Sequence, residues 1–240
     1  MGRRPAGPAG GGARGVTHLW LKLDLAAPLM AFGGVSIDQV GPTRSFPAAS
    51  MLTGLFGNAL GLQWRDRAAH QDLQDRLVFA AAELREGVLI TDSQNAKLEK
   101  TDRGWTTWGE PEGRDGASYG APHRRRRDYL ADAEVVVVAR FRTGAPSTPD
   151  IEAALARPAR PLFLGRKPCL PSRPILAGTV TADSAHDALM AALPDPAGLR
   201  ACWPAEEGPA GHHRHDLPDL RNWITGLHAG TRRVTEGRLP

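Results

Sequence analysis

Residues 17–25 read THLWLKLDL, and residues 132–142 read DAEVVVVARFR. In the first stretch leucine occupies every second position from 19 to 25, which predicts a strand with one buried face. In the second stretch four consecutive valines (135–138) are typical of a central strand that is buried on both faces. We therefore expect both stretches to be strands of the β-sheet around which the chain folds.

The elements around these two strands follow from helical spacing, alternation and turn residues. Ser45 and Pro47 supply helix-start chemistry, and Gly61 can end the helix that follows. The expected order is strand, helix, strand, insertion, strand, helix, strand, which is the β-α-β-β-α-β order of a ferredoxin-like (RRM-like) α+β domain. The further elements are helices over 51–60, 68–76, 148–155 and 184–193, and strands over 77–84, 88–91 and 175–181.

The insertion has an unusual composition. Of the 37 residues at 92–128, only seven are apolar and fifteen are charged. Such a segment cannot build a core and is too long for an ordinary loop, so it is either disordered or a binding arm that orders on a partner. We therefore divide the chain into a disordered tail (1–15), a ferredoxin-like domain (16–145) that carries the insertion, and a small C-terminal domain (146–240).

Composition excludes several classes of protein. The 240 residues include 41% apolar residues but no run of about 18 of them, so we expect no membrane span. Two lone cysteines form no C-x-x-C pair, which argues against a disulfide framework or a cysteine zinc site and fits a reducing cytoplasm. The 30 basic residues include only four lysines. This arginine excess reflects either a GC-rich genome or selection for a planar group that binds phosphate with two parallel hydrogen bonds.

Three basic segments are candidates for phosphate contacts. Arg124–Arg127 end the insertion, and Trp105 and Trp108 precede them with faces on which unpaired bases could stack. Gly165-Arg166-Lys167 is a short basic turn, and Gly41-Pro-Thr-Arg-Ser45 leads into a helix N-terminus whose free N–H groups favour phosphate. The alternatives are a solvated loop end for the arginine run and ordinary capping by Ser45 for the helix. The polar run at 212–216 (HHRHD) is expected to be a solvated loop rather than a metal site.

Four blocks of sequence, taken together, carry a resemblance to a known family. They are FGG at 32–34 with GPTRSFP at 41–47 and SMLTGLFGNALG at 50–61, KLEKTDRGWTTWG at 97–109, RRDYLADA at 126–133, and PLFLGRKPCLP at 161–171. In this order the blocks resemble the Cas-five family of type I-E CRISPR systems, within the RAMP superfamily. The resemblance covers about 16–192.

The resemblance implies a function. Family members have an RRM-like domain, an arginine-bearing thumb and a small C-terminal domain, and they bind the 5′ handle of the CRISPR RNA in the Cascade complex. The implied partners are that RNA, the backbone subunits, the large subunit and, through the complex, target DNA. No membrane partner and no cofactor are expected, and the expected location is cytoplasmic. The RNA-binding candidates are Thr43, Arg44, Ser45, Ser50, Gln94, Lys97, Lys100, Arg103, Trp105, Thr106, Arg124, Arg126, Arg127, Arg166 and Lys167.

Two other functions remain open. Some relatives cut precursor RNA, which needs a general acid and a general base at the scissile 2′-hydroxyl. Here the only convenient candidates are His123 and Tyr129, and Asp92–Asn95 follow Thr91 without a histidine, so we predict no catalytic residue and no metal. A protein-interaction module, whose arginine run meets an acidic partner, is the third hypothesis.

Overall fold

The computed structural model describes residues 16–35, 39–97, 104–105, 111–112, 123–209 and 213–240. The predicted tail at 1–15 lies outside the described residues. So do Lys100, Arg103, Thr106 and Trp108.

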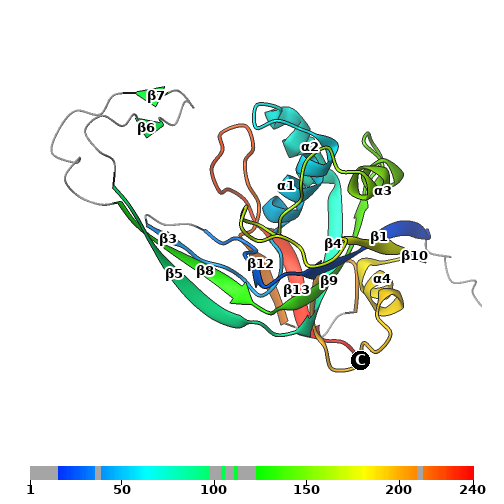
Figure 1. Cartoon of the computed structure of the whole chain (residues 1–240). Coiled ribbons are helices and arrows are strands. Elements are labelled where there is room, and N and C mark those ends of the chain that lie inside the picture. Colours follow the sequence, from blue (N-terminus) through cyan, green and yellow to red (C-terminus); the bar gives the residue numbers. More distant parts are fainter. Residues whose placement is uncertain (1–15, 36–38, 98–103, 106–110, 113–122, 210–212) are drawn as a thin grey trace, which may run out of the picture.

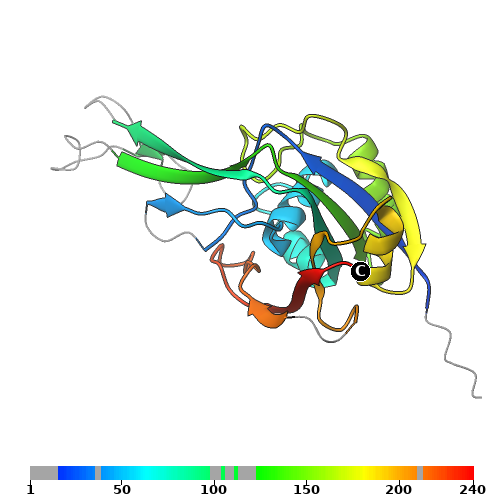
Figure 2. The same ribbon diagram turned by 90° about the horizontal axis from the view of Figure 1, so that it is seen from below.

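The main sheet has seven strands, and every neighbouring pair is antiparallel. The two predicted strands at 17–25 and 132–142 are adjacent in this sheet, with Leu23 opposite Val137. Figures 1 and 2 show this sheet as the body of the molecule. Its order is β10 (Leu176–Ala182), β1 (His18–Ala26), β9 (Glu134–Phe141), β4 (Leu77–Arg85), β11 (Arg200–Pro204), β13 (Arg232–Arg238) and β12 (His213–Leu217).

Helices cover both faces of this sheet. α1 (Ala49–Leu60), α2 (Arg67–Arg76) and α3 (Thr148–Ala156) lie on one side, and α4 (Ala185–Ala192) lies on the other (Figure 1). The valine run of β9 accordingly sends alternate side chains into two separate cores, as predicted for a strand buried on both faces. The prediction that β1 has a single buried face is wrong, because Trp20 is fully buried beneath α4.

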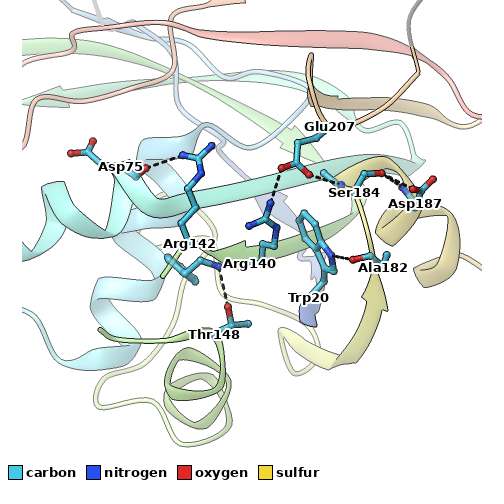
Figure 3. Close-up of polar contacts among 11 residues, drawn as sticks. Trp20, Asp75, Arg140, Arg142, Thr148, Ala182, Ser184, Asp187 and Glu207 are labelled. Atoms are coloured by element: carbon cyan, nitrogen blue, oxygen red, sulfur yellow. Dashed lines mark hydrogen bonds and ion pairs between the residues drawn. The ribbon is translucent and has the colours of Figure 1, made fainter. Parts of the chain in front are cut away.

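A buried ion pair joins α4 to the sheet. Arg140 of β9 contacts Glu207 at 2.7 Å, and its guanidinium lies 4.9 Å from the centre of the Trp20 ring (Figure 3). The second carboxylate oxygen of Glu207 accepts the N–H of Ala185, at the first residue of α4. Because both charged side chains are more than four-fifths buried, this contact fixes the turn after β11 against the helix.

A second sheet forms an arm that projects from the body (Figures 1 and 2). We call the paired strands β5 (Val88–Ala96) and β8 (His123–Ala131) the arm. The short strands β2 (Leu29–Met30) and β3 (Val40–Gly41) pair with β8 on its other edge, and β6 (Gly104–Trp105) pairs with β7 (Pro111–Glu112). All nine residues of β5 are exposed, and for residues 92–96 this agrees with the prediction that the insertion builds no core.

The C-terminal third of the chain continues the main sheet. β10 pairs with β1, and β11 pairs with β4, so strands from both sides of residue 145 share one sheet. The division predicted at 145/146 therefore does not coincide with a boundary between sheets. Trp203 of β11 is fully buried in the core beneath α4. Among the described residues, no helix is long and apolar enough to cross a membrane.

Candidate nucleic-acid interface

The arginine run lies on the arm. Arg124 and Arg126 are opposite Asn95 and Ser93 of β5, and since side chains alternate along a strand, Arg125 and Arg127 face the other side. The first three arginines are exposed, and Arg127 is half-buried. Within the described part of the chain, none of the four forms an ion pair. No described acidic side chain therefore pairs with their charge.

A hollow of about 340 Å³ lies along this part of the arm, and it contains three of the predicted residues. Gln94 donates to the Asp92 carboxylate at 2.7 Å, which aligns the amide beside the arginines. The hollow is therefore polar and positively charged. Its lining consists of Gln39, Ser93, Gln94, Asn95, Arg124, Arg125 and Arg126.

The loop before α1 is fastened to the base of the arm. The N–H of Arg126 donates to the Gln39 carbonyl at 2.9 Å, and β3 runs parallel to β8 beside Arg126 and Arg127. The backbone approaches closely here, because a Cβ on Gly41 would lie 3.0 Å from the side chains of both Arg127 and Arg166, which would have to shift. The GPTRSFP block is thus held against the arginine run.

Arg166 connects three segments at this base. Its two terminal nitrogens donate to the carbonyls of Asp128 (2.9 Å) and Gly41 (2.7 Å), and its guanidinium lies 4.7 Å from the centre of the Tyr129 ring. The Gly165 backbone approaches Ala31 so closely, at a φ of 92°, that no side chain would fit. Arg166 was predicted to contact phosphate. In the structure its two terminal nitrogens form hydrogen bonds with backbone carbonyls. Lys167 beside it is exposed.

Thr43, Arg44 and Ser45 line a different hollow, of about 220 Å³, between the loop before α1 and the β4–β5 turn. The Thr43 hydroxyl accepts the N–H of Phe32 at 3.0 Å, and Arg44 donates to the Pro218 carbonyl at 2.7 Å. Glu83 lies in the same hollow. Burial raises the pKa of its carboxyl, which the neighbouring Arg200 at 3.0 Å opposes. This hollow mixes acidic and basic groups, unlike the one on the arm.

The N-terminus of α1 is already occupied. The helix starts at Ala49 without a side-chain cap from its own segment, and the Asp219 carboxylate accepts the Ala49 N–H at 3.1 Å. The Asp219 carbonyl accepts the N–H of Ser50, also at 3.1 Å. The prediction of capping by Ser45 is wrong, and two of the N–H groups expected to be free for phosphate bond to Asp219 instead. The capping group comes from a position 170 residues away, so no local pattern could reveal it.

The remaining predicted residues are placed as follows. Lys97 is exposed at the outer end of β5, and Trp105 lies in β6 opposite Pro111. His213 and His215 lie on the edge strand β12 with their rings stacked 5.2 Å apart. Among the described residues no three histidine, cysteine, aspartate or glutamate side chains are grouped as metal ligands.

The two candidate acid–base residues do not form a pair. His123 and Tyr129 lie six residues apart on the extended strand β8, which separates them by roughly 20 Å. Tyr129 is 5% exposed and packs in the main core beneath Arg166. This arrangement does not place a general acid and a general base on one scissile bond.

The chain was compared with known proteins. Residues 20–235 match the family described as CRISPR-associated protein (Cas_Cas5). The chain is 30% identical over 195 residues to "CRISPR system Cascade subunit CasD" of Escherichia coli strain K12, covering 81% of this chain and 84% of that protein.

Two solved structures share the fold. A chain of a "CRISPR RNA-guided surveillance complex" aligns with a TM-score of 0.65 at 21% identity over 91% of this chain and 89% of that one. A second, titled "Crystal structure of Cas protein", aligns with a TM-score of 0.55 at 22% identity over 92% and 95%. With a match that spans nearly all of the described sheet and helices, the chain belongs to the Cas5 family of CRISPR-associated proteins.

Proposed function

We propose that this chain is a non-catalytic CRISPR RNA-binding subunit of a Cascade surveillance complex, which caps the 5′ handle of the RNA for RNA-guided recognition of DNA in antiviral defence. The observation that carries the proposal is the arm, on which Arg124–Arg127 form no ion pair among the described residues. The similarity to a protein named as a Cascade subunit supports it.

The physical case rests on charge and shape. RNA phosphates bind unpaired arginine and lysine because binding releases counterions, which makes the affinity depend on salt but not on base sequence. A strand pair that exposes alternate arginines on two faces can contact a backbone that passes around it. Of the proposed ligands, Arg124, Arg126 and Gln94 line one hollow and fit this role best.

We infer that the body is a ferredoxin-like domain with the arm as its thumb. The order β10-β1-β9-β4, antiparallel throughout, supports this, because α1 connects β1 to β4 and α3 connects β9 to β10 on one face. The fourth strand of this unit then comes from the C-terminal third of the chain. The strands β11, β13 and β12 extend the sheet beyond it.

Other subunits of the complex are the proposed protein partners, with a cytoplasmic location. Val88, Leu89 and Ile90 expose 66%, 61% and 39% of their surfaces on β5, whose outer edge is unpaired among the described strands. An exposed apolar strand with a free edge is suited to contact another protein rather than RNA. Trp105 is proposed to stack on an RNA base, and Trp108 to contact a neighbouring subunit.

The endoribonuclease alternative lacks a paired acid and base. Metal-independent cleavage needs both groups at the same 2′-hydroxyl, and the distance between His123 and Tyr129 opposes this. Incubation of the purified chain with precursor CRISPR RNA separates the two functions. Site-specific cleavage without metal would refute the non-catalytic role.

The proposal is tested by the salt dependence of RNA affinity. The double variant Arg124→Gln, Arg126→Gln should weaken binding of CRISPR RNA and reduce the slope of log K against log salt by roughly 0.7 per lost contact. The control double variant Arg142→Gln, Arg157→Gln removes the same charge outside the arm, at two exposed positions that follow β9 and α3. Equal slopes in the two variants would show that the arm does not bind the RNA backbone.

A further inference from the structure

A third hollow, of about 310 Å³, lies beside α1 and is separate from the arm. Four segments form its walls: the segment at 31–33, α1, the turn at 163–166 and the loop that follows β12. This loop, orange-red in Figure 1, stands beside α1 and α2. The residues that give the hollow its chemistry are Gly54, Phe163, Arg166, Arg221, Trp223 and His228.

The hollow carries two arginines, Arg166 and Arg221. Neither Arg166 nor Arg221 forms an ion pair within the described ranges. The Nε atom of Arg221 is buried and has no hydrogen-bond partner there. Burial, with help from the positive charges of Arg221 and Arg44, lowers the pKa of His228. Arg221 is half-buried, and a half-buried cation without an anion is stabilised by an anionic ligand.

The loop wall is held in place before any ligand binds. The Trp223 ring stacks on His70 at 4.7 Å, and its N–H donates to Gln74 at 3.1 Å. Arg221 lies over the same indole ring, 5.1 Å from its centre, and its backbone N–H also donates to Gln74 at 3.1 Å. Because these contacts fix the loop on α2, a ligand does not need to order it.

The other walls are apolar and open. Met51, Leu55 and Phe163 contribute apolar surface. Gly54 leaves space in the middle of α1, where an added Cβ would meet only the Trp223 ring, at 3.9 Å. An apolar slot beside Arg221, which has no ion pair among the described residues, and beside the His228 ring suits a planar aromatic group joined to an anion. Its volume is at the small end of ligand pockets, enough for one nucleotide and too small for a helix.

We propose that this hollow is a subsite for one unpaired nucleotide, with the base against Phe163 and the edge of Trp223 and the phosphate at Arg221. The His228 ring, neutral at pH 7, can then exchange hydrogen bonds with the base edge. This inference rests on the proposed function, because it takes the nucleotide to be part of the bound RNA. A free nucleotide has the same chemistry, and the test separates the two sources.

Photocrosslinking tests the position of the nucleotide directly. The full chain is irradiated with a short single-stranded RNA of mixed sequence that contains 4-thiouridine, and the crosslinked peptides are identified by mass spectrometry. We expect crosslinks in the peptide 222–232 as well as on the arm. Crosslinks on the arm alone would overturn the subsite and leave the proposed function intact. The absence of crosslinks at both places would overturn both.

Gly54→Leu fills the hollow without removing a charge. We expect it to fold, since the Cβ fits and glycine is the weaker helix former. It should abolish crosslinks to 222–232, keep those on the arm, and weaken RNA binding roughly tenfold, as for the loss of one base contact. Ala153→Leu, at an exposed position of α3, is the control and should change nothing. Unchanged crosslinks in Gly54→Leu would refute the subsite.

Arg221→Gln is the second variant. It tests the phosphate contact and leaves the volume of the hollow open, unlike Gly54→Leu. It should reduce both the crosslinks to 222–232 and the salt slope, by roughly 0.7. Competition with uridine monophosphate identifies the source of the ligand. Displacement of the 222–232 crosslinks only by RNA supports the proposal, whereas displacement by low concentrations of the mononucleotide would assign the hollow to a free nucleotide and overturn it.

Discussion

Asp219 is the residue whose replacement should most affect how the candidate interface is held together. Its side chain is fully buried and contacts Arg232 at 2.8 Å, while it also accepts the first N–H of α1. The neighbouring Pro218 carbonyl accepts from Arg44. A single carboxylate therefore connects the loop after β12, the start of α1 and strand β13.

The magnitude follows from these two contacts. Removal of the carboxylate leaves the Arg232 side chain, which is 17% exposed, as an uncompensated buried charge at a cost of about 3 kcal/mol or more. Loss of the hydrogen bond at the helix start adds about 1 kcal/mol. Asp219→Asn keeps an acceptor for the Ala49 N–H, so it should lose only the first contribution, whereas Asp219→Ala should lose both.

Urea denaturation followed by far-UV circular dichroism measures these losses. With a slope of about 3 kcal/mol per molar urea, Asp219→Ala should shift the unfolding midpoint by roughly 1 M. Asp216→Asn is the matched control, because Asp216 pairs with Arg233 at 3.8 Å and both side chains are more than 60% exposed. An exposed pair contributes less than about 1 kcal/mol.

Two outcomes would refute this reasoning. If Asp219→Ala and Asp216→Asn lose the same free energy of unfolding, the buried pair contributes no more than a surface pair. If the double variant Asp219→Ala, Arg232→Met is no more stable than Asp219→Ala alone, the cost does not come from the unpaired arginine, because methionine removes the charge and keeps most of the volume.

Three further predictions concern the side chains of Cys202, His228 and Glu207. The Cys202 thiol, whose pKa burial raises to about 12, should not react with a thiol reagent at pH 8 until the chain unfolds, and rapid reaction in the folded protein would contradict its burial. His228 should titrate below its usual pKa of 6.5 in nuclear magnetic resonance, since burial and the nearby arginines disfavour its charged form, and Arg221→Gln should move the pKa upward. The folded form of His228 binds fewer protons, so its contribution to stability is present above pH 6.5 and is lost as pH falls below that value. Glu207→Ala should reduce the free energy of unfolding by about 3 kcal/mol because it leaves Arg140 buried and unpaired, and a loss below about 1 kcal/mol would show that water reaches this site.

The sequence alone determined the elements whose causes are local. Alternation predicted β1, the valine run predicted β9, and the glycine at 61 ends α1 in the left-handed conformation, as predicted. A helix was predicted over 148–155, and α3 starts there, with Ser147 just before it and Asp150 forming a capping box. The charge-rich composition of 92–128 likewise predicted a segment outside the core, and its ends are the arm. Each of these signals acts over a few residues, so it can be read without the fold.

Only the tertiary structure decided which distant groups meet. The start of α1 is capped from residue 219, and the terminal nitrogens of Arg166 bond to carbonyls 38 and 125 residues away in the chain. The hollow beside α1 is lined by both Gly54 and Trp223. The sequence around either residue does not indicate that the other lies next to it. The C-terminal strands β11, β12 and β13, whose sequence pattern is weak, also belong to the main sheet because of contacts between distant segments. Their stability comes from pairing with strands more than a hundred residues earlier, such as β4, and that pairing exists only once the chain has folded.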